Sequence, residues 1–221
     1  MRSSLPVCTA AAAAAAAAAL LLAATTASAE GGDSGPDYDP GKALRRSDFA
    51  AGISTGGAFG TAGGYPNDAN KIGIGRYHAD TGAAGGISNT FWVGAAMRDW
   101  LVLGVGLSGS TVAGSGTIST GGAFVFHVET FPLFYQGGVF HDLALVGDFG
   151  LGGRTINRAS SEVASGGAMS FASLGFLWET FRAGKHFSSG PILQVTEQFS
   201  DTMNSTLVVA GFQLAYYGGP T

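Results

Sequence analysis

Large apolar residues alternate with small or polar residues through the middle of the chain. Every second residue from Leu101 to Leu107 is a large aliphatic, whereas Gly104, Gly106 and Ser108 are small. The same alternation returns over residues 124–129 and 143–151. A period of two residues predicts strands that have one apolar face and one slim or polar face.

The distribution of polarity between the two faces indicates where these strands lie. Aromatic and aliphatic side chains share one face of each strand, while His127, Glu129 and Asp148 fall on the other among glycine, alanine and serine. A strand protein in water buries its apolar faces, whereas a barrel in a bilayer turns them outward to lipid. We therefore predict a transmembrane β-barrel.

The alternation predicts eight strands between residues 47 and 217, and hence an all-β, eight-stranded, antiparallel, up-and-down transmembrane β-barrel. The expected strands are 48–60, one marked by Phe91 to Met97, one ending near Val112, 122–134, one around 143–151, 168–179, 190–199 and 205–217. Long loops are expected over 61–86, 113–121 and 154–167, and shorter connections between them. This alternation is typical of outer-membrane barrels, in which external loops are long and periplasmic turns short. An even number of strands places both ends of the barrel on the periplasmic side.

Composition indicates how the chain is exported and where its segments begin and end. Residues 1–29 read as a removable export signal, with Arg2 before an alanine-rich apolar run and a small-residue cleavage motif, and they contain the single cysteine, Cys8. Residues 30–46 read as a flexible, acidic lead-in rich in glycine and proline, residues 47–217 as the barrel, and residues 218–221 as a tail. Charged residues make up 12% of the chain, against about 25% in soluble domains. The net charge of −4, without a basic run, argues against a nucleic-acid partner.

The chain resembles the small outer-membrane barrels of the OmpA, OmpX and opacity type. The features that carry this resemblance are the predicted export signal, the eight amphipathic strands and a last strand ending in Tyr216 and Tyr217. The resemblance covers residues 48–217 and rests on pattern and length. It implies an outer-membrane location and a structural or surface-contact role without catalysis. Members of this type commonly end on an aromatic residue, whereas here Gly218 to Thr221 follow the last strand.

Several ionisable side chains are expected inside the barrel. The inward positions include His127, Glu129, Asp148 and Glu179, together with Trp92, and Arg98 is a candidate counter-charge. A barrel of eight strands is just wide enough for side chains to fill it. The favoured interpretation is a hydrated, plugged interior, and the alternative is a narrow, cation-leaning pore.

Two motif matches lack the context that their chemistry requires. Residues 104–109 match the dinucleotide string G-x-G-x-x-G, but the residues that follow are poor helix formers and the fingerprint needs a helix there. His78, His127, His141 and His186 lack the spacing of a metal site, although His78 and Asp80 could hold an ion loosely.

An enzymatic alternative is lipid A deacylation, which one family of eight-stranded barrels performs with a His-x-Ser pair and a glutamate. His186 and Ser188 match the pair, but Glu197 has the opposite parity and so faces the other side of an unbulged strand. A secreted soluble β-sandwich or lipocalin-like binding protein is the remaining alternative.

The sequence thus predicts a monomeric outer-membrane barrel with no catalytic, cofactor-binding or metal-binding residues. Its expected contacts are outer-membrane lipid and a surface ligand bound through loops 61–86, 113–121 and 154–167.

Overall fold

A computed structural model describes residues 46–136, 140–184 and 186–218. The predicted export signal with Cys8, the lead-in up to residue 45 and tail residues 219–221 lie outside this part of the chain. Within it, no helix is both long and apolar enough to cross a membrane.

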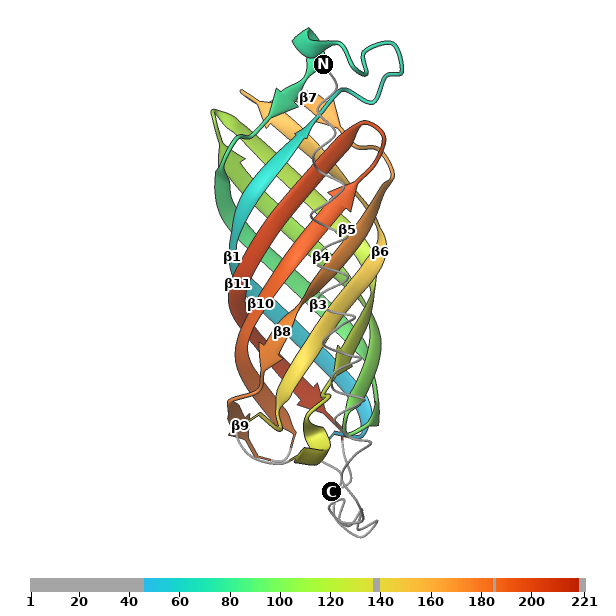
Figure 1. The fold of residues 1–221 in the computed structure, drawn as a ribbon, viewed down its shortest axis with the longest axis vertical. Coiled ribbons are helices and arrows are strands. Elements are labelled where there is room, and N and C mark those ends of the chain that lie inside the picture. The colour runs from blue at the N-terminus through green and yellow to red at the C-terminus, as the bar shows by residue number, and fades with distance from the viewer. Residues whose placement is uncertain (1–45, 137–139, 185, 219–221) are drawn as a thin grey trace.

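Long antiparallel strands close on themselves into a barrel (Figure 1). Within the described residues, the ring contains β1 (Asp48–Gly64), β3 (Ala84–Arg98), β4 (Leu101–Gly114), β5 (Thr117–Thr130), β6 (Leu143–Arg158), β8 (Met169–Trp178), β10 (Phe187–Phe199) and β11 (Met203–Tyr217). Each strand pairs with the next along the chain, and β1 also pairs with β11 from Ala50 opposite Tyr217 to Gly64 opposite Met203. The predicted closed, eight-stranded barrel is confirmed.

Short elements decorate the two ends of the barrel. The loop end carries η1 (Gly75–Tyr77), β2 (Ala79–Asp80) and β7 (Ser161–Ser165). The terminal end, where β1 begins and β11 ends, carries η2 (Phe134–Gln136) and β9 (Phe181–Ala183).

The outer surface is apolar, as the alternation predicted. Leu107 and Phe59 are 63% and 62% exposed, and Leu151 is 69% exposed, whereas their neighbours Ser108 and Ala58 point inward and are buried. Exposed side chains of this kind recur on every long strand, and a soluble protein rarely exposes so continuous an apolar surface. The chain is a transmembrane β-barrel with an apolar outer face.

Two of the three predicted long loops are wrong. Residues 113–121 are the ends of β4 and β5, joined by a tight turn at Ser115 and Gly116, whose φ angles are 48° and 72°. Residues 154–167 contain the end of β6 and all of β7, joined at Ala159 and Ser160 with φ angles of 47° and 68°. Two successive residues with positive φ match the hairpin turn whose twist suits antiparallel strands. The glycine, serine and threonine residues that suggested loops are the slim side chains of the barrel wall itself.

The first predicted loop is confirmed in shortened form. β1 and β3 extend into residues 61–86, so the connection between them spans 65–83 and includes η1 and β2. The expected alternation of long and short connections is also wrong, because the connection from β5 to β6 at the terminal end is longer than the two-residue turn after β4.

The interior is filled by side chains from all around the ring. Towards the terminal end, Trp92, Phe131, Leu177 and Tyr217 pack in one buried cluster. Towards the loop end a second cluster includes Ile156, Met169 and Met203. Small residues in the wall make room for the large ones inside.

A glycine in β1 creates the space for the largest of these side chains. A Cβ added at Gly52 would lie 2.5 Å from Cε2 of Trp92, whereas one added at Gly57, further along the same strand, would meet nothing within 4 Å. We expect Gly52→Ala to lower the free energy of unfolding by about 1–3 kcal/mol, as overpacking does. The matched control Gly57→Ala should change it by less than about 0.5 kcal/mol.

Urea titration of the protein folded in detergent micelles measures both variants, with the mobility change on heating as the sign of a closed barrel. Equal stabilities for the two variants would contradict the packing of Trp92 against Gly52.

Candidate functional site

The predicted inward residues do lie inside the barrel, near its terminal end. His127 and Glu129 on β5, Asp148 on β6 and Glu179 directly after β8 are each at most 4% exposed, and Trp92 is fully buried. The period of two residues was sufficient to place all of them.

Arg98, the predicted counter-charge, is not among them. The pairing of β3 with β4 shifts register between Ala96 and Arg98, which leaves Met97 as an extra residue in β3. Such a bulge reverses the facing of the residues after it. Arg98 is therefore exposed at the rim instead of inside.

His127 lies between two carboxylates. Its Nδ1 is 2.6 Å from Oδ1 of Asp148 and its Nε2 is 3.0 Å from Oε1 of Glu129. Ionised carboxylates only accept hydrogen bonds, so both ring nitrogens donate when the imidazole carries a positive charge. The ring also stacks on Trp92 with 4.5 Å between centroids, an arrangement that favours a cation. The charge of His127 thus offsets those of the two acids.

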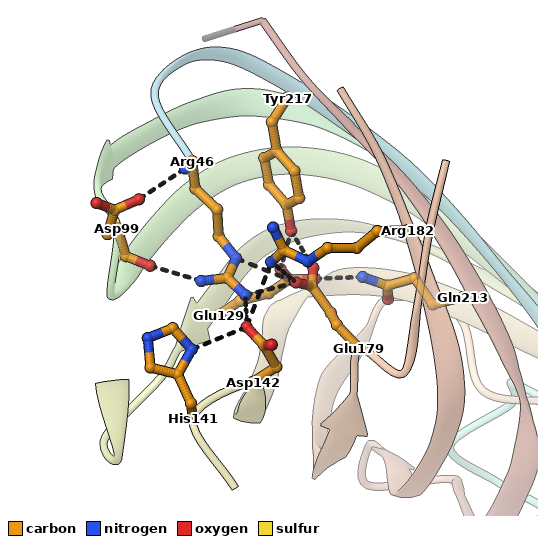
Figure 2. Close-up of polar contacts among 9 residues, drawn as sticks. All are labelled: Arg46, Asp99, Glu129, His141, Asp142, Glu179, Arg182, Gln213 and Tyr217. Atoms are coloured by element: carbon orange, nitrogen blue, oxygen red, sulfur yellow. Dashed lines mark hydrogen bonds and ion pairs between the residues drawn. The ribbon is translucent and has the colours of Figure 1, made fainter. Parts of the chain in front are cut away.

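Glu129 forms contacts across the lumen. Its Oε1 accepts a hydrogen bond from Nε2 of Gln213 at 2.5 Å, and its Oε2 lies 3.4 Å from the hydroxyl of Tyr217. Gln213 and Tyr217 belong to β11, which lies four strands from β5 in either direction around the ring. These bonds therefore join opposite walls of the barrel (Figure 2).

The tyrosine extends the network to a second acid and a buried arginine. The hydroxyl of Tyr217 donates to Oε1 of Glu179 at 2.7 Å, and Oε2 of Glu179 accepts from Nη2 of Arg46 at 2.5 Å. The same nitrogen of Arg46 lies 2.8 Å from Oδ1 of Asp142. Figure 2 shows these side chains converging at the terminal end of the barrel.

Arg46 is the principal counter-charge that the sequence did not reveal. Its side chain is fully buried, with Cζ 3.6 Å from the ring centroid of Phe131. Burial alone lowers the pKa of an arginine, but the charge of Glu179 raises the pKa of Arg46 above its ordinary value. Arg46 falls at the end of the predicted lead-in because it precedes the first strand. Only the excess of buried acids signals that a cation must come from outside the strands.

A second buried arginine lies towards the loop end. Arg154 donates from Nε to Oε1 of Gln198 at 2.8 Å and from Nη1 to Oγ of Ser119 at 3.1 Å, and Nη2 donates to Ser110. The alternation that places Asp148 inside also places Arg154 inside, six residues along β6. The prediction missed it because the strand was expected to end before residue 154.

We call the buried set that spans the terminal half of the lumen the cross-lumen network. It consists of Arg46, His127, Glu129, Asp148, Glu179, Gln194, Gln213 and Tyr217; Gln194 joins it by donating to Oδ2 of Asp148 at 3.2 Å. Acids, cations and amides in it neutralise and bond to one another, so it holds the two walls together.

The residues of the deacylase alternative are not brought together. Ser188 is buried inside the barrel, whereas Glu197 lies on the other face of β10, where it accepts a weak bond from Thr206 at 3.4 Å. His186 donates from Nδ1 to the backbone oxygen of Tyr217 at 2.8 Å, at the terminal end. The predicted opposite facing of the pair and Glu197 is confirmed.

The G-x-G-x-x-G string over residues 104–109 is part of β4. His78 and Asp80 lie 3.8 Å apart in the connection over residues 65–83. Across the described ranges, no three His, Cys, Asp or Glu side chains are grouped so as to hold a metal ion.

Comparisons with known proteins give structural similarity only. No protein-family model matches the chain, and no curated protein sequence matches it either. The crystal structure of Ail, the attachment invasion locus protein of Yersinia pestis, is 8% identical with a TM-score of 0.47, covering 76% of this chain and 99% of that one. The outer membrane protein OprG of Pseudomonas aeruginosa is 9% identical with a TM-score of 0.42, covering 78% of this chain and 98% of that one. Ail in complex with the heparin analogue sucrose octasulfate is 9% identical with a TM-score of 0.41, covering 76% and 99%. At these values the similarities assign no family and no ligand to the chain.

Glu129 offers the sharpest test of the cross-lumen network. Glu129→Ala leaves the buried donors His127 Nε2 and Gln213 Nε2 without their acceptor, so we expect the free energy of unfolding to fall by about 3–5 kcal/mol. Glu197→Ala on the outer face is the matched control and should change it by less than about 0.5 kcal/mol.

Urea unfolding in detergent micelles, followed by tryptophan fluorescence, measures both. If Glu129→Ala proved as stable as Glu197→Ala, the network would not hold the two walls together.

Proposed function

We propose that the chain is an outer-membrane barrel that presents residues 65–83 for contact at the cell surface, with a lumen that does not conduct and without catalysis. The observation that carries the proposal is the cross-lumen network, in which Glu129 on β5 is hydrogen-bonded to Gln213 on the opposite strand. A barrel crossed by such bonds is suited to rigidity, since an open pore would need these groups to face water.

The apolar surface and the strand architecture support the proposed location. Barrels with an apolar outer face and polar groups inside are the strand proteins of outer membranes. The predicted export signal over residues 1–29 provides the route to that membrane. Lipid is then the partner of the outer face, and one chain is sufficient to close the ring.

The connection over residues 65–83 is a folded protrusion suited to surface contact. Thr81 anchors its base, because its hydroxyl accepts a hydrogen bond from the backbone N–H of Ala62 at 3.0 Å. Within the connection Lys71 Nζ lies 3.0 Å from Oδ2 of Asp68, and the hydrogen bond from Lys71 lowers the pKa of that carboxyl. Ile72 and Ile74 are exposed beside these charges. A partner at this site would meet apolar and charged groups together.

The buried acids and histidine support a structural role over a catalytic one. His127 has the geometry of a polarised imidazole, but its side chain is 2% exposed and lies beneath Trp92. A general base must reach the proton that it abstracts from a substrate. Nothing bound at the surface could reach this ring without opening the barrel.

The lumen can be tested by conductance. We expect the purified chain to insert into liposomes, as flotation would show, and to give no conductance steps in a planar lipid bilayer, because the cross-lumen network fills the ion path. Asp148→Ala should leave that silent baseline unchanged. A cation-selective current that Asp148→Ala or Glu129→Ala reduces would instead support the narrow, cation-leaning pore.

The orientation of the barrel in the membrane can be tested by labelling introduced cysteines. The single cysteine of the chain, Cys8, lies in the predicted export signal, so the barrel segment itself has no thiol to react. We expect Arg76→Cys, on the exposed connection, to react with a membrane-impermeant maleimide in intact cells. Ala183→Cys, exposed on β9 at the terminal end, should react only after the outer membrane is permeabilised. Labelling of Ala183→Cys but not Arg76→Cys in intact cells would refute the proposed surface role of residues 65–83.

A further inference from the structure

A small recess lies at the terminal end, on the rim of the barrel. It encloses about 250 Å³ between the start of β1, the turn from β3 to β4, and η2. Sites for drug-sized ligands occupy roughly 300–1,000 Å³, so this volume suits a smaller polar group. Its lining includes Ser47, Asp48, Arg98, Asp99, Trp100 and Tyr135.

Two opposite charges line this recess without being paired. Arg98 and Asp48 are both exposed, and neither side chain makes a hydrogen bond or ion pair with another described residue. Asp99 contributes one further carboxylate, of which Oδ1 accepts the backbone N–H of Arg46 at 2.7 Å. The recess therefore offers a cation and an anion to a ligand that carries both signs.

The hydroxyl of Ser47 is a second, independent sign of a ligand. The residue is 6% exposed, and its Oγ has no hydrogen-bond partner among the described residues. Buried hydroxyls are nearly always hydrogen-bonded, so an unpaired one in the wall of a recess points to a polar group that enters it. A donor beside a guanidinium is a fitting environment for phosphate oxygens.

The edge of the recess is apolar. Met97, Trp100 and Tyr135 are 58%, 37% and 54% exposed and stand beside the charged groups. Tryptophan and tyrosine at a barrel rim lie at the level of lipid headgroups. A ligand held here would thus have a charged part in the recess and an apolar part along the outer wall.

We propose that the rim recess binds the headgroup of a zwitterionic phospholipid with a primary ammonium, of the phosphatidylethanolamine class. The phosphate lies against Arg98 and the hydroxyl of Ser47, and the ammonium donates to the carboxylate of Asp48. The acyl chains follow Met97 and Trp100 onto the lipid-facing wall. This proposal rests on the membrane placement proposed above and specifies which lipid one rim of the barrel selects.

Two competing lipids each lack one feature of the phosphatidylethanolamine headgroup. Phosphatidylglycerol carries no cation for Asp48, and phosphatidylcholine carries an ammonium without N–H donors. Native mass spectrometry of the full chain in detergent, with each lipid added in turn, measures the occupancy of the first bound lipid. We expect phosphatidylethanolamine to bind about tenfold more tightly than either competitor, as one additional charge-assisted contact would give.

Two substitutions test the proposed roles of Arg98 and Asp48 in binding the lipid. Arg98→Gln should weaken binding of all three lipids, whereas Asp48→Asn should remove the preference for phosphatidylethanolamine over phosphatidylcholine and leave phosphatidylglycerol unaffected. Arg76→Gln, which removes an exposed arginine on the opposite end of the barrel, is the matched control and should bind as the unchanged chain does.

The outcomes that overturn the proposal are distinct. Equal affinity of the unchanged chain for the three lipids, or a preference that survives Asp48→Asn, would refute the site. Soluble glycerophosphoethanolamine that displaces the lipid at equal concentration would show that the recess holds a free zwitterion and no membrane lipid. Mobility on a gel before and after heating is read on the same samples. A closed barrel without lipid preference refutes this site alone, whereas a chain without the mobility change refutes the membrane barrel as well.

Discussion

The pairing of β1 with β11 is the constraint on which the rest of the structure depends. A strand in lipid cannot leave its backbone N–H and C=O groups unpaired, because no water is present to bond them. The pairing from Ala50 opposite Tyr217 to Gly64 opposite Met203 gives the first and last strands of the ring their second neighbours. Because the sheet is closed, one face of every strand points outward and the other faces a narrow lumen. The apolar exterior and the crowded interior are both consequences of it.

The crowded interior creates an electrostatic problem that the cross-lumen network resolves. Buried carboxylates are costly unless cations and hydrogen-bond donors face them. Here His127 lies between two acids, Tyr217 and Gln213 reach Glu129 from the opposite wall, and Arg46 meets Glu179 from a position before the first strand. The same contacts that neutralise the acids cross-brace the barrel. This dual role favours a rigid anchor for the protrusion and argues against a channel.

The two ends of the barrel are chemically different, and this difference fits different surroundings. The loop end carries a folded protrusion with exposed charges and isoleucines. The terminal end carries aromatic residues on the outer rim, such as Phe49 packed against Tyr216 and Phe140 near Trp178. Aromatic rings at a membrane interface fix the depth of a barrel in the bilayer. The recess beside Arg98 lies within this rim, where a lipid headgroup would reach it.

The sequence alone determined the fold class, the facing of most strand residues and the identity of the buried acids. A period of two residues is a property of the extended backbone and needs no tertiary information, so His127, Glu129 and Asp148 could be placed inside from the pattern. Tertiary structure decided the rest. Residues 113–121 form strand ends and a tight turn, although their small side chains are equally typical of loops. Only pairing across the sheet distinguishes a strand from a loop here. Arg98 left the interior through a bulge that pairing with β4 imposes. Arg46 entered it from outside any strand, because the requirement to neutralise buried charge operates across the lumen between residues far apart in the chain.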